Sequence, residues 1–350
     1  MNIKVGIVGL GYWGPHLLRN FIAQPLCTLV YACDLQQSHL TKIKAHYPSI
    51  TTTTQYSDLL EDASLDLILV ATPTETHYTL AKAALEHGKH VFIEKPMATS
   101  SAEAEALIQL SRKVDKMIFV DHTFVFAPAV QRISELIHRG DLGDLLYFDS
   151  SRINLGLIQK ETNVLWDLAI HDLSILSTFV DLSDITTVSA HGSAHFGQQE
   201  ELAHLHLTFR SDFQAHIAVS WLSPLKIRQT IVAGTQAMVL YDDTQPSEKI
   251  RIYDRGIEHD HTKPDPFFPK YRSGDILIPA LPLQETLGLE AEHVLACIRY
   301  GTKPLVSGQE GLQVLTILEA ADRSLEQRGV PIELSAAKRT AIALTQYTQT

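Results

Sequence analysis

Short apolar runs alternate with helical patterns over the first third of the chain. We predict buried strands near 3–8, 27–33, 66–71, 90–93 and 117–121, with a short additional strand near 51–54. The segments between them predict helices, among them 15–23, 75–87 and 101–114, the last with Ser101 as its N-cap. Strands that alternate with helices form parallel sheets with crossover helices. The pattern therefore predicts a doubly wound α/β domain of the Rossmann type over residues 1–122.

A different pattern begins beyond Pro128. Helices are predicted at 128–139 and 167–180, with a strand at 145–154 between them. Strand-like runs joined by short turns, typical of an antiparallel meander, follow at 186–195, 202–209, 213–221, 227–233 and 237–241. The proline-rich stretch 255–283 predicts a long irregular loop, before helices at 285–300 and 308–327. We expect residues 123–350 to form an α+β domain with a large open, mostly antiparallel sheet, whose uncovered face joins subunits into a homodimer or homotetramer.

The first predicted strand runs directly into a glycine-rich turn. Gly9, Gly11 and Gly14 form a G-x-G-x-x-G pattern, in which the glycines permit a tight turn and a close approach of backbone N–H groups to a pyrophosphate. Asp34 ends the second strand, where its carboxylate can accept hydrogen bonds from ribose hydroxyls and would repel a 2′-phosphate. The arrangement predicts a dinucleotide site that takes NAD rather than NADP.

A charged turn follows the predicted strand at 90–93. Glu94, Lys95 and Pro96 lie at the carboxyl end of that strand, where open α/β sheets bind their ligands. A proline after Lys95 restricts the lysine backbone and can be cis, so it fixes the direction of the side chain. An ammonium there can hydrogen-bond a substrate hydroxyl and stabilise a developing alkoxide. A solvated strand exit is the alternative interpretation.

A second candidate pair is Asp167 and His171. On a helix they are four residues apart and share a face. A carboxylate beside an imidazole fixes its tautomer, and histidine is a suitable acceptor for the proton of an alcohol. Asp172 could equally be the partner of the imidazole, and a plain helix-surface contact remains the alternative.

Two pairs of polar residues mark the predicted sheet as a substrate surface. Arg152 and Asn154 are two residues apart on one strand and so point to one face, and Lys226 and Arg228 repeat that spacing. Cations in this arrangement can bind a diphosphate or a sugar carboxylate. A solvated strand face would look the same in the sequence.

Composition excludes several classes of function. The chain has 350 residues, enough for two domains, and a formal net charge of −11 without a basic stripe, which argues against nucleic-acid binding. Three cysteines without paired spacing indicate a reducing, cytoplasmic setting rather than a disulfide framework. No apolar run approaches the length of a membrane span, so we expect neither secretion nor membrane insertion.

Histidine pairs offer weak metal candidates. His204 and His206 share a strand face, and His259 and His261 lie in the predicted loop. Neither pair has a third ligand at the spacing of a metal site, so we predict no metal.

Taken together and in order, these motifs resemble the glucose-fructose oxidoreductase and inositol dehydrogenase family (Gfo/Idh/MocA). The resemblance rests on the fingerprint at 9–14, the turn Ala71-Thr72-Pro73 followed by His77, the Glu94-Lys95-Pro96 turn and the spacing of Asp167 and His171, and it runs over most of the chain. It implies that Lys95, Asp167 and His171 are catalytic. The cofactor residues that it implies, together with those of the fingerprint, are Gly9, Gly11, Tyr12, Trp13, Gly14, Asp34, Ala71, Thr72, Pro73, Thr74, His77, Glu94, Lys95 and Pro96.

The resemblance implies NAD-dependent oxidation of a secondary alcohol of a sugar. Residues 221–228 and 164–171 look most similar to the branch that oxidises C3 of UDP-N-acetylglucosamine or its uronic acid, giving a 3-keto sugar for polysaccharide or lipid A assembly. In this hypothesis His171 takes the hydroxyl proton, although Lys95 could be the base instead. An inositol or free-sugar dehydrogenase is one alternative, and a non-catalytic NAD-responsive regulator is another.

Overall fold

The computed structural model describes residues 2–258 and 270–334, and its chain divides into two compact units. The first unit comprises Met1–Phe126 and Leu283–Thr316, and the second comprises Ala127–Pro282 and Ile317–Thr350. The sequence-based boundary at 122 placed the segment 283–316 in the second domain, whereas in the structure it belongs to the first unit. The histidines of the predicted pair His259 and His261 lie outside the described residues.

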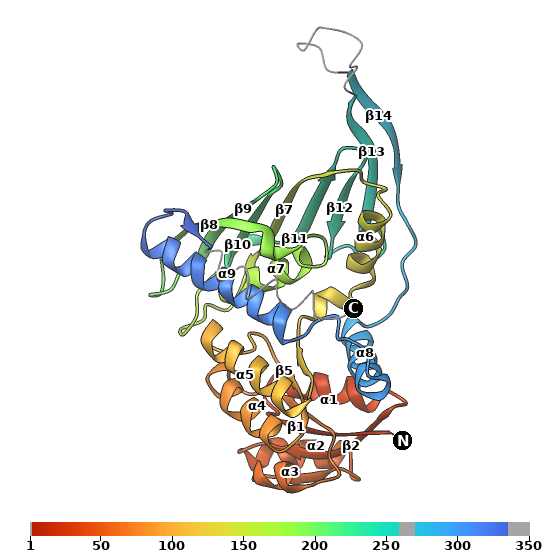
Figure 1. Cartoon of the computed structure of the whole chain (residues 1–350), viewed down its shortest axis with the longest axis vertical. Coiled ribbons are helices and arrows are strands. Elements are labelled where there is room, and N and C mark those ends of the chain that lie inside the picture. The colour runs from red at the N-terminus through yellow and green to blue at the C-terminus, as the bar shows by residue number, and fades with distance from the viewer. Residues whose placement is uncertain (1, 259–269, 335–350) are drawn as a thin grey trace. The chain divides into compact units, whose positions relative to one another are not determined.

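A six-stranded parallel sheet lies at the centre of the first unit (Figure 1). Its strand order is β3-β2-β1-β4-β5-β6. Its strands are β1 (Ile3–Val8), β2 (Cys27–Cys33), β3 (Thr51–Thr53), β4 (Leu67–Val70), β5 (His90–Ile93) and β6 (Ile118–Val120). The helices are α1 (Gly14–Ile22), α2 (Gln37–His46), α3 (Ser57–Glu61), α4 (His77–Glu86), α5 (Ser101–Val114) and α8 (Thr286–Tyr300), with short 3-10 turns η1 (Thr74–Thr76) and η2 (Thr123–Phe126). The predicted doubly wound domain is confirmed.

Local chemistry explains where these elements begin and end. All four residues of β4 are buried, as expected for a central parallel strand covered on both faces. Ser100, rather than the predicted Ser101, caps α5 by accepting a hydrogen bond from the backbone N–H of Glu103. Helix α8 returns to this unit because its apolar face, including Leu287 and Val294, packs into the core around β1 and α1.

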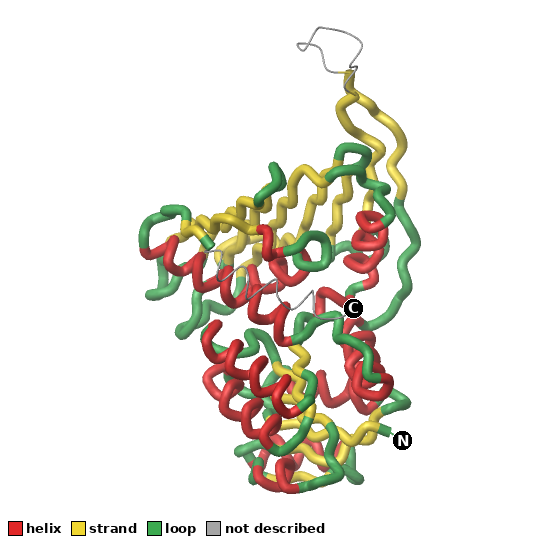
Figure 2. The backbone as a smooth tube through the Cα atoms, viewed as in Figure 1, coloured by secondary structure: helices red, strands yellow, loops and turns green. Residues whose placement is uncertain are grey.

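A nine-stranded sheet forms the second unit, in the order β14-β13-β12-β11-β7-β10-β9-β8-β15. Its strands are β7 (Leu145–Leu155), β8 (Ile185–Ser193), β9 (Leu202–Phe209), β10 (Gln214–Ser220), β11 (Leu222–Gly234), β12 (Met238–Asp242), β13 (Ile250–Glu258), β14 (Lys270–Leu277) and β15 (Ile332–Glu333). Its helical segments are α6 (Pro128–His138), a π-helical turn η3 (Leu165–Ala169), α7 (Ile170–Leu176) and η4 (Leu182–Asp184), while α9 (Gly308–Glu326) crosses from the first unit into the second. Figure 2 shows the contrast between the helices and the long strands of this unit.

Two expectations for this unit are wrong. The predicted simple meander is interrupted, because β7 lies between β10 and β11 and pairs with β10 in parallel. The predicted irregular loop at 255–283 contains the end of β13 and all of β14, which pair with each other. The prediction of a large, mostly antiparallel sheet is confirmed.

The two faces of the sheet differ in burial. Phe148, Ser150 and Arg152 of β7 are buried, and α6 and α7 lie on one side of the sheet (Figure 1). The alternate residues face the other way, and Tyr147 and Ile231 are exposed there.

Candidate active site

The glycine-rich turn between β1 and α1 is tightly built except at one position. Gly9 has φ +93°, and a Cβ on it would lie 2.4 Å from the carbonyl oxygen of Ala71. A Cβ on Gly14 would lie 2.1 Å from the carbonyl oxygen of Gly9. A Cβ on Gly11, in contrast, would meet no described atom within 4 Å. The backbone is therefore compact where it packs on protein and open at Gly11, which fits a pyrophosphate approaching that glycine.

Asp34 follows β2 and is held beside this turn. Its carboxylate accepts hydrogen bonds from the backbone N–H groups of Leu10 and Gln36, each at 2.7 Å, and lies 3.2 Å from Nδ1 of His39. Burial opposes the charge, but these donors outweigh it and lower the pKa of Asp34. A charged acceptor fixed in this place fits the ribose hydroxyls of NAD.

A tryptophan of the fingerprint connects the turn to the end of β6. Nε1 of Trp13 donates a hydrogen bond of 3.0 Å to Oδ2 of Asp121, and the hydroxyl of Thr123 donates to the other oxygen. Tyr12 beside it is largely exposed. Asp121 is not among the predicted site residues, although its place directly after a buried strand matches that of Asp34.

His77 joins the two strand-end turns of the predicted cofactor site. One ring nitrogen lies 2.8 Å from the carbonyl oxygen of Thr72, and the other lies 2.8 Å from that of Pro96. Burial lowers the pKa of His77. The Lys95–Pro96 peptide is cis. The turn after β4 and the turn that carries Lys95 are thus tied together by one buried imidazole.

Three acidic side chains of the first unit lie close enough to influence one another: Glu94, Asp121 and Glu290. The backbone N–H of Lys95 donates to Glu94 at 3.0 Å, while the other oxygen of Glu94 is buried. Burial, followed by the charge of Asp121, raises the pKa values of Glu94 and Glu290 well above the ordinary value for glutamate. Burial also lowers the pKa of His122 to about 4. Glu290 is not among the predicted site residues, because nothing in its local pattern on α8 distinguishes it from a surface glutamate.

The predicted pair of the second unit lies on an irregular helix. Asp167 is in the π-helical turn η3, and His171 is in the first turn of α7. The two residues are thus four apart across the junction of these two segments, and their common face stays a prediction. Oδ2 of Asp167 accepts a hydrogen bond of 2.9 Å from Nε1 of Trp221, a contact that sequence analysis did not find.

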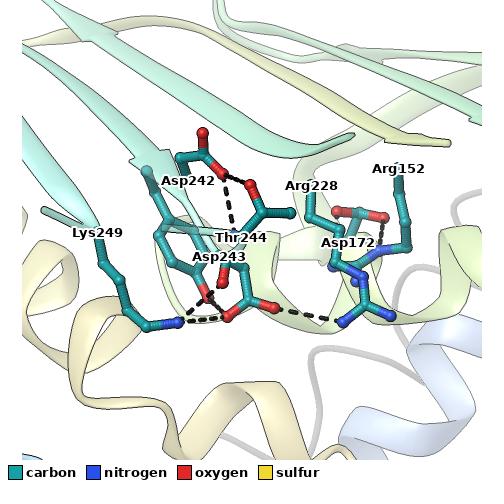
Figure 3. Close-up of polar contacts among 8 residues, drawn as sticks. Arg152, Asp172, Arg228, Asp242, Asp243, Thr244 and Lys249 are labelled. Atoms are coloured by element: carbon teal, nitrogen blue, oxygen red, sulfur yellow. Dashed lines mark hydrogen bonds and ion pairs between the residues drawn. The ribbon is translucent and has the colours of Figure 1, made fainter. Parts of the chain in front are cut away.

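Arg152 and its neighbours form a charged cluster on the covered face of the sheet (Figure 3). Arg152 donates to Asp172 through Nε at 2.7 Å and Nη2 at 3.2 Å, and both side chains are at least 95% buried. Asp172, the other candidate partner of the imidazole, is therefore engaged with Arg152 of the sheet. Arg228 and Lys249 pair with Asp243 nearby at 3.3 and 3.0 Å, and both are about one-third exposed.

The remaining predicted substrate residues lie on the same two strands. Asn154 is two residues beyond Arg152 on β7 and half-buried, and Lys226 is exposed on β11, where a register shift separates it from regular pairing with β7. His204 and His206 share a face of β9, and His204 stacks on His216 with ring centroids 5.9 Å apart. Within residues 2–258 and 270–334, no three histidine, cysteine or acidic side chains gather as a metal site would require.

Comparison with known proteins supplies the family. Residues 3–122 match the model for "Oxidoreductase family, NAD-binding Rossmann fold", and residues 130–240 match the GFO/IDH/MocA C-terminal domain. The chain belongs to the Gfo/Idh/MocA family of oxidoreductases. It is thus an NAD-dependent oxidoreductase, in agreement with the open glycine turn and with Asp34.

Individual relatives are similar over different lengths. The chain is 34% identical to the uncharacterized oxidoreductase YdgJ of Escherichia coli K12 over 43% of this chain and 42% of that protein. It is 23% identical to scyllo-inositol 2-dehydrogenase (NAD(+)) of Bacillus subtilis over 95% of this chain and 96% of that protein. A structure of UDP-N-acetylglucosamine 3-dehydrogenase GnnA from Acidithiobacillus ferrooxidans has a TM-score of 0.79 at 22% identity, covering 94% of this chain and 99% of that chain.

Among the described residues, no helix is long and apolar enough to cross a bilayer.

Proposed function

We propose that this protein oxidises a secondary alcohol of a sugar with NAD, at C3 of a UDP-linked N-acetylamino sugar. The observation that supports it most is the lysine turn after β5, which is joined through His77 to the neighbouring strand end of a dinucleotide-binding sheet. A side chain leaving a sheet there is directed toward the ligand region of an open α/β fold. The likeness of the chain to the structure of GnnA favours a nucleotide sugar.

The proposed chemistry divides the work among three residues. Bound NAD would supply the hydride acceptor. The ammonium of Lys95 hydrogen-bonds the reacting hydroxyl and stabilises the negative charge that develops on its oxygen. The imidazole of His171 takes the hydroxyl proton, and Asp167 orients that imidazole. In the alternative assignment, Lys95 takes the proton itself.

Replacing Lys95 by methionine tests this proposal. Lys95→Met retains the length of the side chain and removes the charge, so the Kd for NAD should stay within about three-fold while kcat falls by about 10³-fold or more. Calorimetric NAD titration and NADH absorbance measure the two quantities. Turnover equal to wild type would refute the role of Lys95.

A second candidate is an inositol or free-sugar dehydrogenase. The similarity to an inositol dehydrogenase over nearly the full length of both proteins favours it. A thermal-shift screen of UDP-sugars, inositols and free sugars with NAD present separates the two, because a ligand at 100 times its Kd stabilises by about 2.7 kcal/mol. Stabilisation by UDP-sugars and competition by UDP support the first candidate. Absence of NAD reduction with every sugar would favour the regulator instead.

We also propose that a second copy of the chain covers the open face of the nine-stranded sheet. The exposed side chains of Tyr147 and Ile231 would be buried in this interface, as would the His204–His216 stack. Light scattering after size-exclusion chromatography should show a dimer or tetramer that Ile231→Lys dissociates.

A further inference from the structure

Every tryptophan of the chain donates its indole N–H to an aspartate. The sequence contains three tryptophans, and the bonds are Trp13 to Asp121 at 3.0 Å, Trp166 to Asp322 at 2.7 Å and Trp221 to Asp167 at 2.9 Å. Hydrogen bonds to an ionised acceptor are the strong ones, and they fix orientation as well as adding energy. Of the three aspartates, only Asp167, the acceptor of Trp221, has a role in the proposed reaction.

The indole of Trp221 is itself rigidly held. The residue is 1% exposed and lies between β10 and β11. Its backbone N–H donates to the carbonyl oxygen of Glu201, and its carbonyl oxygen accepts from the N–H of Gly156, both at 2.9 Å. A Cβ on Gly156 would lie only 2.9 Å from Cδ1 of the indole, so the end of β7 closes against the ring. This donor therefore has a fixed position in the second unit.

The segment that carries Asp167 is held on both sides. Asp167 belongs to a π-helical turn, a rare conformation that occurs frequently at functional sites. Next to it in the sequence, Trp166 bonds to Asp322 of α9, which also accepts a hydrogen bond of 2.8 Å from Asn163. The indole of Trp166 thus bonds to α9 and not to Asp167, whereas Trp221 contacts the carboxylate of Asp167 directly.

We propose that Trp221 is a positioning residue, which holds the carboxylate of Asp167 in the orientation that steadies His171. The role of Asp167 in this inference rests on the proposed function. The hydrogen bond between the indole and the carboxylate is independent of it. With Oδ2 held by the indole, rotation of the carboxylate is restrained, and its second oxygen keeps to a narrower range of directions. Without the indole, the carboxylate rotates about its χ angles and the imidazole four residues later loses a fixed neighbour.

Trp221→Phe tests the proposal, with Trp166→Phe as a matched control. Each change removes one indole N–H donor to an aspartate and keeps an aromatic ring. Loss of a hydrogen bond to a charged group that acts on the transition state lowers kcat by about 10- to 100-fold. We expect Trp221→Phe to show that loss with KM within about two-fold, and Trp166→Phe to keep both constants within about three-fold. Equal losses in the two variants, or a kcat for Trp221→Phe within three-fold of wild type, would overturn the proposal.

A second measurement is independent of turnover. The three indole N–H groups give three resolvable signals in a ¹⁵N–¹H correlation spectrum, each assigned by its Trp→Phe variant. Asp167→Ala should move the Trp221 signal upfield and accelerate its hydrogen exchange while the Trp166 signal stays, and Asp322→Ala should do the reverse. A Trp221 signal unchanged in Asp167→Ala contradicts the inference. If no sugar is oxidised by wild type but these shifts occur, the proposed function has failed while the anchoring bond stands.

Discussion

Removing the carboxylate of Asp172 should destabilise the second unit more than any other single change in the charged cluster. Arg152 and Asp172 are 5% and 1% exposed and are joined by two hydrogen bonds of 2.7 and 3.2 Å. The hydroxyl of Ser150 donates to the same carboxylate at 2.7 Å. Asp172→Ala would leave the buried guanidinium without this counter-charge, which costs about 3–5 kcal/mol. For a domain of about 150–250 residues, this predicts a Tm lower by about 6–20 °C.

The assay is thermal and urea unfolding of four proteins. Wild type and Asp172→Ala are compared with Arg152→Met/Asp172→Leu, which removes both charges and fills the space. A buried ion pair replaced by apolar side chains is often neutral or stabilising, so the double variant should lie within about 1 kcal/mol of wild type. Arg228→Met is the matched control, because its partner Asp243 lies 3.3 Å away and the two side chains are 35% and 21% exposed. A pair this exposed is worth less than about 1 kcal/mol.

Two results would refute this reasoning. If Asp172→Ala lost less than about 1 kcal/mol, the buried charge would have found other compensation. If the double variant were as unstable as Asp172→Ala, the loss would come from packing and not from an uncompensated guanidinium.

Three further predictions concern the nucleotide-binding unit. Asp34→Ala removes the ribose acceptor and its negative charge, so the ratio of kcat/KM for NAD to that for NADP should fall by about ten-fold or more, and an unchanged ratio would contradict the assignment. Trp13→Phe removes the hydrogen bond between the glycine turn and Asp121, so calorimetry should show a Kd for NAD that is about 3- to 10-fold higher. A Kd equal to that of wild type would mean that this hydrogen bond does not contribute to NAD binding. Burial raises the pKa of Glu290 in the folded protein, so its stabilising contribution is complete only below the unfolded pKa near 4.5 and is lost as pH rises toward the folded pKa. Glu290→Gln should therefore gain stability relative to wild type by about 1.4 kcal/mol per pH unit in that window, measured by urea unfolding over a series of pH values, and a difference that does not change with pH would contradict the assignment.

Elements with strong periodicity could be predicted from the sequence. The strands of the first sheet were found within about two residues, because each is a short apolar run bounded by turn residues. The G-x-G-x-x-G turn and Asp34 were found because their chemistry depends on residue type at fixed local spacing. Helix α8 was found as a helix but assigned to the wrong unit, since its apolar face gives no information about which core it joins.

The partners of the candidate site residues could not be predicted in the same way. The acceptors of His77 are backbone carbonyl oxygens of Thr72 and Pro96, which residue type does not reveal. Arg152 was expected on a substrate surface, but its partner Asp172 lies on α7, twenty residues away in the chain. The alternation of side chains along β7 does place Arg152 and Asn154 on one face of the sheet. It gives no information on whether helices cover that face.

The strand order of the second sheet explains why Trp221 was missed. In a simple meander, β10 and β11 would pair as a hairpin, and Trp221 between them would occupy a tight exposed turn. Because β7 lies between these strands, the chain must cross the end of β7 in passing from one to the other. The register aligns Ser220 with Ile153, which brings Trp221 to the closing residue Gly156 and buries its ring. The donor that holds Asp167 is therefore a product of strand order, which depends on pairing over long sequence separation rather than on any local pattern.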